Sequence, residues 1–346
     1  MAALHAAPPV ARGRPRAAAG PAPARTVAHP YAGRVPHGTH DHGDDPRNEQ
    51  ILIWVNGELK PRAEAVVSVF DSGFVLGDGV WEGIRVHDGH PVFWEQHLDR
   101  LLEGAAAIML DLGMTREELT AAVYEVLRAN DMHDGVHIRL MVSRGVKSTP
   151  YQDPRVTVGP PTVVLIPEHK EPLPETVRDG ITLFTTHVRR ATPDTLDPKL
   201  NAHSKLNDIT ACIQAYTAGA DEALMLDPHG FVATCNSTHF FVVKGTPEDP
   251  EVWTSDGRFC LAGITRGNVL RVCRDRGLPA HERTFSLTDV YSAQEAFVTG
   301  TFAGVVPVRS VDGRTIGTGA RGPVVERLQD WYAEHVAADA ARRSAP

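Results

Sequence analysis

The chain has 346 residues, of which 42% are hydrophobic and 23% charged, and its formal net charge is −8. These values are typical of a globular protein with two domains, and the negative charge argues against nucleic acid as the main partner, because phosphate binding needs a basic face. No apolar run approaches the length that spans a bilayer, so a membrane protein is not expected. Four scattered cysteines without a CxxC pair favour a reduced, cytoplasmic protein.

The first part of the chain has a composition of its own. Residues 1–40 contain no Asp or Glu and are rich in Ala, Pro and Arg, without a hydrophobic period. We therefore predict a disordered tail over residues 1–48, and the Arg-rich start leaves an organellar transit peptide open. The tail carries His29, His37, His40 and His42, but no fixed scaffold spaces these side chains, so no metal site is predicted.

A small α+β domain is predicted over residues 49–175. Its strands are expected at 51–55, 66–70, 80–86, 136–143 and 162–167, with Asn56-Gly57 as a hairpin turn. One helix is expected over 97–110, from the spacing of its leucines. A capping box formed by Thr115 and Glu118 indicates that a second helix begins there and runs to about residue 130.

A larger domain is predicted over residues 180–341. Its strands are expected at 181–188, 222–226, 231–233, 240–243 and 296–299, and its helices at 205–218, 265–276, 287–291 and 323–341. Strands and helices do not alternate strictly, and the sequence contains no GxGxxG loop. A doubly wound dinucleotide-binding domain is therefore not expected.

Two glycine turns have the composition of anion sites. The run Leu261-Ala262-Gly263-Ile264-Thr265-Arg266 leads into a predicted helix, and Gly300-Thr301 ends a predicted strand. Such a turn offers free backbone N–H groups, the positive end of a helix dipole and a hydroxyl to a phosphate. Because threonine is also a common helix cap, either turn alone is weak evidence.

Several motifs, in one order along the chain, resemble the fold-type IV pyridoxal phosphate (PLP) enzymes, the family of branched-chain and D-amino acid aminotransferases. The phosphate-binding residues of that family are resembled by Arg100 in His97-Leu98-Asp99-Arg100-Leu101, by Gly263-Ile264-Thr265-Arg266 and by Gly300-Thr301. Family-like text also occurs at Phe70-Asp71-Ser72-Gly73-Phe74, Trp81-Glu82-Gly83-Ile84-Arg85, Gly219-Ala220-Asp221-Glu222-Ala223 and Gly322-Pro323.

This resemblance covers about residues 51–332. It implies the two-domain α+β fold of the family, with a larger, α/β-barrel-like C-terminal domain. It also implies a homodimeric, PLP-dependent enzyme that acts on an amino acid or an amine, with aminotransfer as the first expectation.

The family's cofactor lysine, which forms a Schiff base with PLP, is not at its usual place. When the family's lysine segment is laid on residues 196–207 without a gap, the lysine position falls on Asn201 and the tyrosine position on Lys205. An amide nitrogen is not nucleophilic, so Asn201 cannot form the Schiff base. In a helix, positions 201 and 205 would share a face about 6 Å apart. Lys205 is therefore our candidate catalytic lysine, with Lys199, or no lysine, as the alternatives.

A second departure concerns the pyridine nitrogen of the cofactor. The resemblance places Thr234 where the family usually has a glutamate that keeps this nitrogen protonated, and a neutral hydroxyl cannot do so. Lyase or racemase chemistry, or PLP binding without turnover, therefore stays open beside aminotransfer. His203 and His239 are candidate acid/base groups, and the candidates for binding a substrate carboxylate are Arg139, Arg144, Arg189 and Arg190. The predicted cofactor-binding set is Arg100, Asn201, Thr234, Gly263, Ile264, Thr265, Gly300 and Thr301.

Overall fold

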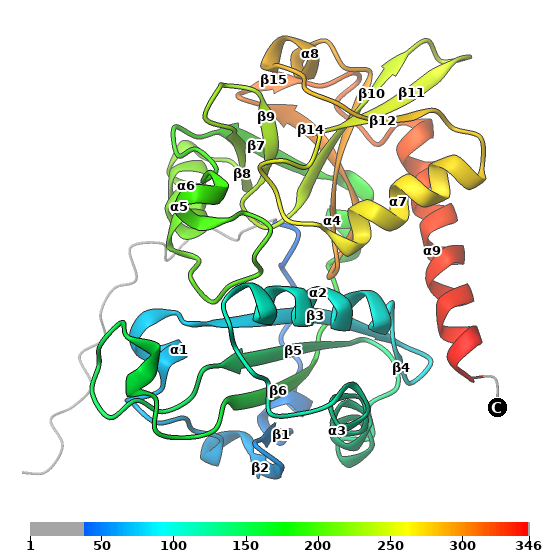
Figure 1. Cartoon of the computed structure of the whole chain (residues 1–346). Helices are drawn as coiled ribbons and strands as arrows, with labels where there is room; N and C mark the ends of the chain where they lie inside the picture. Colours follow the sequence, from blue (N-terminus) through cyan, green and yellow to red (C-terminus); the bar gives the residue numbers. More distant parts are fainter. Residues whose placement is uncertain (1–37, 345–346) are drawn as a thin grey trace, which may run out of the picture. The chain divides into compact units, whose positions relative to one another are not determined.

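The computed structural model describes residues 38–344 (Figure 1). Two β-sheets form the framework, with helices packed on them and apolar clusters buried around each sheet. This agrees with the predicted α+β class. Most of the predicted tail, including His29 and His37, lies outside the described residues.

The first sheet is antiparallel throughout and has six strands in the order β2-β1-β6-β5-β3-β4. Its strands are β1 (Leu52–Val55), β2 (Glu58–Pro61), β3 (Gly79–His87), β4 (His90–Pro91), β5 (Val136–Ser143) and β6 (Thr162–His169). The predicted hairpin turn is confirmed, since Asn56 and Gly57 join β1 to β2 at φ values of 49° and 92°. Such positive φ angles are the ones that a two-residue hairpin requires.

The strand predicted over residues 66–70 is wrong. That stretch is irregular and leads into α1 (Ser72–Leu76), while β2 pairs with β1 instead. Val66 is 72% exposed and Val69 is 67% exposed, so these apolar side chains do not belong to the core. A β-branched run that stays at the surface has no sheet face to pack on.

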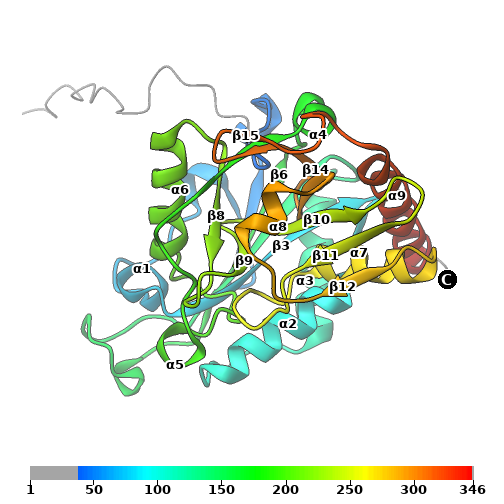
Figure 2. The same cartoon turned by 90° about the horizontal axis from the view of Figure 1, so that it is seen from above.

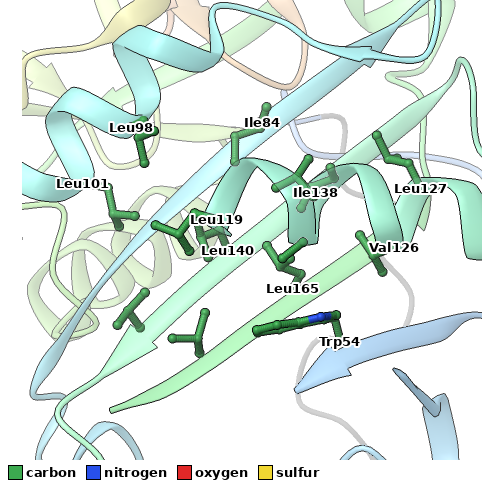
Figure 3. Close-up of a cluster of buried hydrophobic side chains, with 14 of the residues drawn as sticks. Trp54, Ile84, Leu98, Leu101, Leu119, Val126, Leu127, Ile138, Leu140 and Leu165 are labelled. Carbon is green, nitrogen blue, oxygen red and sulfur yellow. The ribbon is translucent and has the colours of Figure 1, made fainter. Parts of the chain in front are cut away.

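Two helices complete the core of the first sheet (Figure 3). They are α2 (Trp94–Ala107) and α3 (Arg116–Ala129), and the predicted capping box of Thr115 and Glu118 is present at the start of α3. Figure 3 shows Leu98 and Leu101 of α2 and Leu119 of α3 beside the strand residues Ile84 and Ile138. Each such buried side chain contributes about 1.5–3 kcal/mol. This packing fixes α2, whose residue Arg100 reaches the site.

The second sheet has nine strands in the order β12-β11-β10-β13-β14-β7-β8-β9, and β15 pairs with β14. The strands are β7 (Ile181–Thr185), β8 (Glu222–Leu226), β9 (Val232–Cys235), β10 (His239–Gly245), β11 (Pro250–Thr254), β12 (Ala280–Glu282), β13 (Glu295–Gly300), β14 (Gly304–Val311) and β15 (Arg314–Thr315). Strand β7 ends three residues earlier than predicted, and β11, β12, β14 and β15 were not predicted. The pairs β7–β8, β7–β14 and β11–β12 are parallel, so the sheet is mixed.

The remaining helices pack on this sheet and on one another. They are α4 (Pro174–Asp179), α5 (Pro193–Leu196), α6 (Leu206–Ala218), α7 (Ile264–Asp275), α8 (Leu287–Tyr291) and α9 (Pro323–Ser344). Helix α7 contacts α9, and α6 contacts β8, as Figure 2 shows. Among residues 38–344 no helix is long and apolar enough to cross a membrane.

Residues 38–48 differ from the tail that was predicted for them. Thr39 is 2% exposed, and it donates its backbone N–H, over 3.2 Å, and its hydroxyl to the carboxylate of Glu222 in β8. Residues 46–49 form a short 3₁₀ helix. Composition alone could not reveal this position, because it depends on one buried side chain, Thr39, and on its distant partner Glu222.

Candidate active site

A cavity of about 480 Å³ contains every residue of the predicted cofactor-binding set in its wall, together with Lys205. Helix α2 contributes Arg100, the loop before α6 contributes Asn201, and β9 contributes Thr234. Both glycine turns also reach the wall. Residues that are far apart in the sequence are thus assembled around one space of the size that small-molecule sites usually have.

The N-terminus of α7 forms part of the cavity wall. Gly263 is the N-cap residue, no side chain caps the helix, and the first turn of a helix leaves its N–H groups without intrahelical partners. The buried hydroxyl of Thr265 in that turn accepts a hydrogen bond from Tyr332 at 3.4 Å. A Cβ atom on residue 263 would lie 2.2 Å from Nε2 of His239, so only glycine allows this close approach.

Arg100 joins α2 to the same turn. Its Nη1 donates to the carbonyl oxygen of Ala262 at 2.9 Å, and its Nε and Nη2 donate to the two oxygens of Glu82 at 2.8 and 2.6 Å. Nδ1 of His97 lies 2.6 Å from the same carboxylate. Burial alone would raise the pKa of Glu82, but the charge and hydrogen bonds of Arg100, with His97, hold that pKa at about 2. Glu82 is therefore an anion that orients the guanidinium.

The second glycine turn follows β13. Gly300 and Thr301 line the cavity, and so does Thr299 beside them. Thr299 is fully buried, and among the described residues its hydroxyl has no hydrogen-bond partner. A buried hydroxyl without a partner is costly, and here it lies in the wall of a cavity, where a polar ligand can satisfy it.

Asn201 is tied to the first sheet. Its Nδ2 donates to the carbonyl oxygen of Trp81 at 2.6 Å, and the backbone N–H of Trp81 donates to the carbonyl oxygen of Asn201 at 3.0 Å. His203 extends this pairing, since its backbone N–H donates to Gly79 and its Nε2 lies 3.0 Å from the carbonyl oxygen of Val80. His203 therefore joins this loop to β3 by hydrogen bonds and does not line the cavity.

Lys205 faces the cavity from the residue before α6. The helical turn expected between positions 201 and 205 is absent, because α6 begins at Leu206, but Nζ of Lys205 still donates to Oδ1 of Asn201 at 3.3 Å. The ammonium lies 5.5 Å from the centre of the Trp81 ring. Burial lowers the pKa of Lys205. The negative charge of Asp208 opposes this shift, and the positive charges of Arg190, Arg100 and Arg139 add to it. In contrast, Lys199 is exposed and does not line the cavity.

Thr234 and His239 form the wall between β9 and β10. The hydroxyl of Thr234 donates to the carbonyl oxygen of Thr238 at 2.8 Å and lies 3.4 Å from Nδ1 of His239. Burial lowers the pKa of His239 well below its usual range, and Arg266 and Arg100 act in the same direction. This imidazole is therefore neutral at pH 7, and both side chains present neutral groups to the cavity.

The four candidate arginines have different partners. Arg144 donates to Asp78 at 2.7 and 3.0 Å, and Arg189 donates to the carbonyl oxygen of Thr186 at 3.4 Å; neither lines the cavity. Arg190 lines it but is ion-paired with Asp208. Arg139 lines it and stacks on Trp81, with its guanidinium carbon 3.8 Å from the ring centre. Among the described residues, Arg139 forms no ion pair with a carboxylate.

The wall also contains residues that were not among the predicted site residues, among them His40, Trp81, His137 and Phe302. Trp81 belongs to the family-like motif Trp81-Glu82-Gly83-Ile84-Arg85, so the sequence contained a signal for it. His40 was assigned to the tail. The ring of His137 lies 5.6 Å from that of Phe302, and burial lowers the pKa of His137 well below its usual range.

Comparisons with known proteins agree with this geometry. Residues 79–311 match the family model of amino-transferase class IV. Branched-chain-amino-acid aminotransferase-like protein 2 of Arabidopsis thaliana is 40% identical over 287 residues, which are 83% of this chain and 50% of that protein. The chain thus spans about half the length of this relative and of a second plant relative.

Other relatives match over nearly their full length. The branched-chain-amino-acid aminotransferase of Pseudomonas aeruginosa is 34% identical over 81% of this chain and 91% of its own. Among solved structures, the branched-chain amino acid aminotransferase from Thermobaculum terrenum, in its PLP-form, superposes with a TM-score of 0.75. That structure is 26% identical and covers 85% of this chain and 96% of its own.

Proposed function

Because the chain belongs to the amino-transferase class IV family, we propose that it is a PLP-dependent aminotransferase acting on an amino acid or amine, with Lys205 as the lysine that carries the cofactor. One observation carries the proposal: the buried amino group of Lys205 faces the same cavity as a free helix N-terminus and an arginine. In this site PLP supplies a carbonyl that exchanges amines and a ring that stores electrons.

The phosphate end of the cavity fits the cofactor. The first turn of α7 offers N–H groups, Arg100 lies against that turn, and Thr265 and Thr301 offer hydroxyls. The hydroxyl of Thr299, which has no partner among the described residues, supports this fit, because it is a buried group that a polar ligand in the cavity can satisfy. These groups hold and orient a phosphate in the way that helix N-termini bind anions.

Lys205 supplies the amine that carries the cofactor and that takes up and releases protons. Its lowered pKa increases the fraction of neutral amine, which is the nucleophilic form. Asn201 accepts a hydrogen bond from Nζ and so directs the side chain, while its own amide is fixed by Trp81. The residue at the family's lysine position thus positions the amine instead of supplying it.

The substrate carboxylate has one cation available to it. Arg139 lines the cavity without a carboxylate partner among the described residues, whereas Arg100 and Arg190 are held by Glu82 and Asp208. Stacking on Trp81 keeps the guanidinium plane fixed. We therefore propose that Arg139 binds the carboxylate of an amino acid substrate.

The decisive experiment locates the cofactor lysine. The purified protein is saturated with PLP, reduced with borohydride and digested, and the pyridoxylated peptide is mapped by mass spectrometry. We expect the label on Lys205, and we expect Lys205→Ala to lose both the label and the visible absorbance of bound cofactor. Lys199→Ala is the matched control and should behave as the parent does. A label on Lys199, or no label with no chromophore, contradicts the proposal.

Thr234 favours a second candidate, a PLP lyase or racemase. Its hydroxyl proton is committed to Thr238, so Thr234 offers the ring only a neutral acceptor, and the ring stores electrons less well than beside a carboxylate. Amino acids incubated singly with the loaded protein separate the alternatives. A stoichiometric keto acid indicates aminotransfer, inversion of the α-carbon indicates a racemase, and released ammonia indicates a lyase.

A homodimer is the third part of the proposal. Helix α6 exposes Leu206 (76%), Ile209 and Ile213, which lie on one side of the helix. Apolar side chains grouped in this way are typical of a surface that a second copy covers.

Two further expectations stay proposals. The division into domains over 49–175 and 180–341 is supported by the strands, because each sheet draws its strands from one side of residues 170–180. The cytoplasmic location rests on cysteine usage, and the four cysteines are free thiols in the structure.

A further inference from the structure

The segment Gly38–His42, which precedes the first sheet, reaches the cavity. His40 lines the cavity, and its ring stacks on that of Phe302 at 5.9 Å and an interplanar angle of 20°. His42 contacts the same ring edge-on at 6.3 Å but does not line the cavity. Thr39 anchors the segment to β8 through Glu222.

The hydrogen bonds around Thr39 determine which nitrogen of His40 carries its proton. Thr39 has one hydroxyl proton, and it donates this proton to Oε1 of Glu222, while Thr238 donates to Oε2 at 2.8 Å. Nδ1 of His40 lies 3.1 Å from the same Thr39 hydroxyl oxygen, which can then only accept. Nδ1 is therefore the donor, and Nε2 of His40 keeps a free lone pair.

This imidazole is neutral at physiological pH. The side chain of His40 is itself partly open to solvent, but desolvation by the groups around it, with the charges of Lys170 and Arg139, lowers its pKa. Burial raises the pKa of Glu222, and the hydrogen bonds from Thr39 and Thr238 offset this rise only in part. A carboxylate, a hydroxyl and an imidazole are thus linked in a row that ends at the cavity.

We propose that His40 contacts the substrate side chain and determines specificity, with Thr39 and Glu222 as positioning residues, so that side chains with an O–H or N–H donor are preferred. This rests on the proposed function. The wall is rich in donors, among them Arg139 and Lys205, whereas Nε2 of His40 is an acceptor. A carboxylate has no proton to give to this lone pair, and the substrate amine belongs at Lys205. The side chain is therefore the part of the substrate that is left to contact His40.

The first test compares threonine with valine, which differ by a hydroxyl in place of a methyl group. Both enantiomers of each are assayed with the PLP-loaded protein, the His40→Phe variant and the His42→Phe variant. Phenylalanine keeps a ring against Phe302 but lacks the acceptor. We expect the kcat/KM ratio of threonine to valine to fall about two- to tenfold in His40→Phe, which is the range of one hydrogen bond, and to stay unchanged in His42→Phe. An unchanged ratio in His40→Phe overturns the proposal.

The second test does not depend on turnover. Nitrogen NMR of the ¹⁵N-histidine-labelled protein should show His40 protonated on Nδ1, with a pKa below the ordinary value of a histidine, and added threonine should shift the His40 signals more than valine does. Thr39→Val should abolish the Nδ1–H form, and Thr39→Ser should retain it. An Nε2–H form in the parent, or no shift of His40 with either amino acid, overturns the proposal.

The two proposals fail separately. A pyridoxylated Lys205 together with an unchanged threonine-to-valine ratio removes the role of His40 and leaves the aminotransferase in place. An unlabelled Lys205 removes the aminotransferase, and the NMR signals of His40 still decide whether its Nε2 meets an added amino acid.

Discussion

Replacing Glu82 by glutamine tests whether one buried carboxylate holds both the fold and the cofactor site. Glu82 is fully buried between Arg100 and His97, and its pKa falls from the ordinary 4.5 to about 2. Because the pKa is lowered in the folded protein, the stabilisation is complete above pH 4.5 and is lost as the pH falls toward 2. At about 1.4 kcal/mol for each pH unit between these values, the carboxylate contributes about 3 kcal/mol.

The assay is urea unfolding between pH 7 and pH 3.5. By pH 3.5 the parent should lose about 1.4 kcal/mol on account of Glu82 alone. Glu82→Gln should be less stable by about 3 kcal/mol at pH 7, since Arg100 keeps its charge without an anionic partner, and its stability should vary less with pH. Glu103→Gln, an exposed change on α2, the helix that carries Arg100, should follow the parent.

The same variant has a functional readout. Arg100 reaches the turn at Ala262 only while Glu82 holds its other two nitrogens, so PLP affinity measured by fluorescence quenching should fall about tenfold, the equivalent of one lost charge-assisted hydrogen bond. If Glu82→Gln unfolds with a pH profile parallel to that of the parent and binds PLP equally well, the reasoning is refuted.

Three further outcomes follow from the geometry. Gly263→Ala should weaken PLP binding at least about tenfold, because the new methyl group meets the imidazole on β10, whereas Gly267→Ala in the same helix meets nothing within 4 Å and should bind normally; equilibrium dialysis compares them. Iodoacetamide should label half-buried Cys212 before Cys273, whose pKa burial raises to about 12, and PLP should slow the labelling of Cys212 in the cavity wall; peptide mass spectrometry checks this. We expect the parent to be a dimer in light scattering, as proposed, and Leu206→Asp to be a monomer, whereas a parent that is already monomeric contradicts the interface.

The fold was predictable where local patterns and packing agree. The leucines of α2 and the capping box of α3 marked two helices correctly because their apolar faces are also the buried faces. Residues 66–70 have the composition of a strand but no sheet to pack on. Strand β14 was missed because Pro307, which has no N–H to donate, lies in the middle of a strand that is nevertheless central.

The site divides in the same way. That Gly263, Thr265 and Thr301 meet in one cavity wall was predictable, because they lie in short motifs whose backbone geometry is local. The choice between Lys199 and Lys205 was left open by the sequence, and the structure puts Lys205 alone of the two in the cavity wall. The position of His40 could not be foreseen, because it depends on one contact between residues 183 positions apart.

The bonds between residues 201–203 and β3 bear on how this site can change by mutation. The amide of Asn201 joins the carbonyl of Trp81 to the ammonium of Lys205. A lysine at position 201 would break both bonds and place two ammonium groups in one cavity, where like charges repel. Moving the lysine to position 201 therefore requires a neutral residue at 205 at the same time. Adding the lysine at 201 first brings two ammonium groups together, and removing Lys205 first leaves the cavity without its lysine amine, so each single change has a cost.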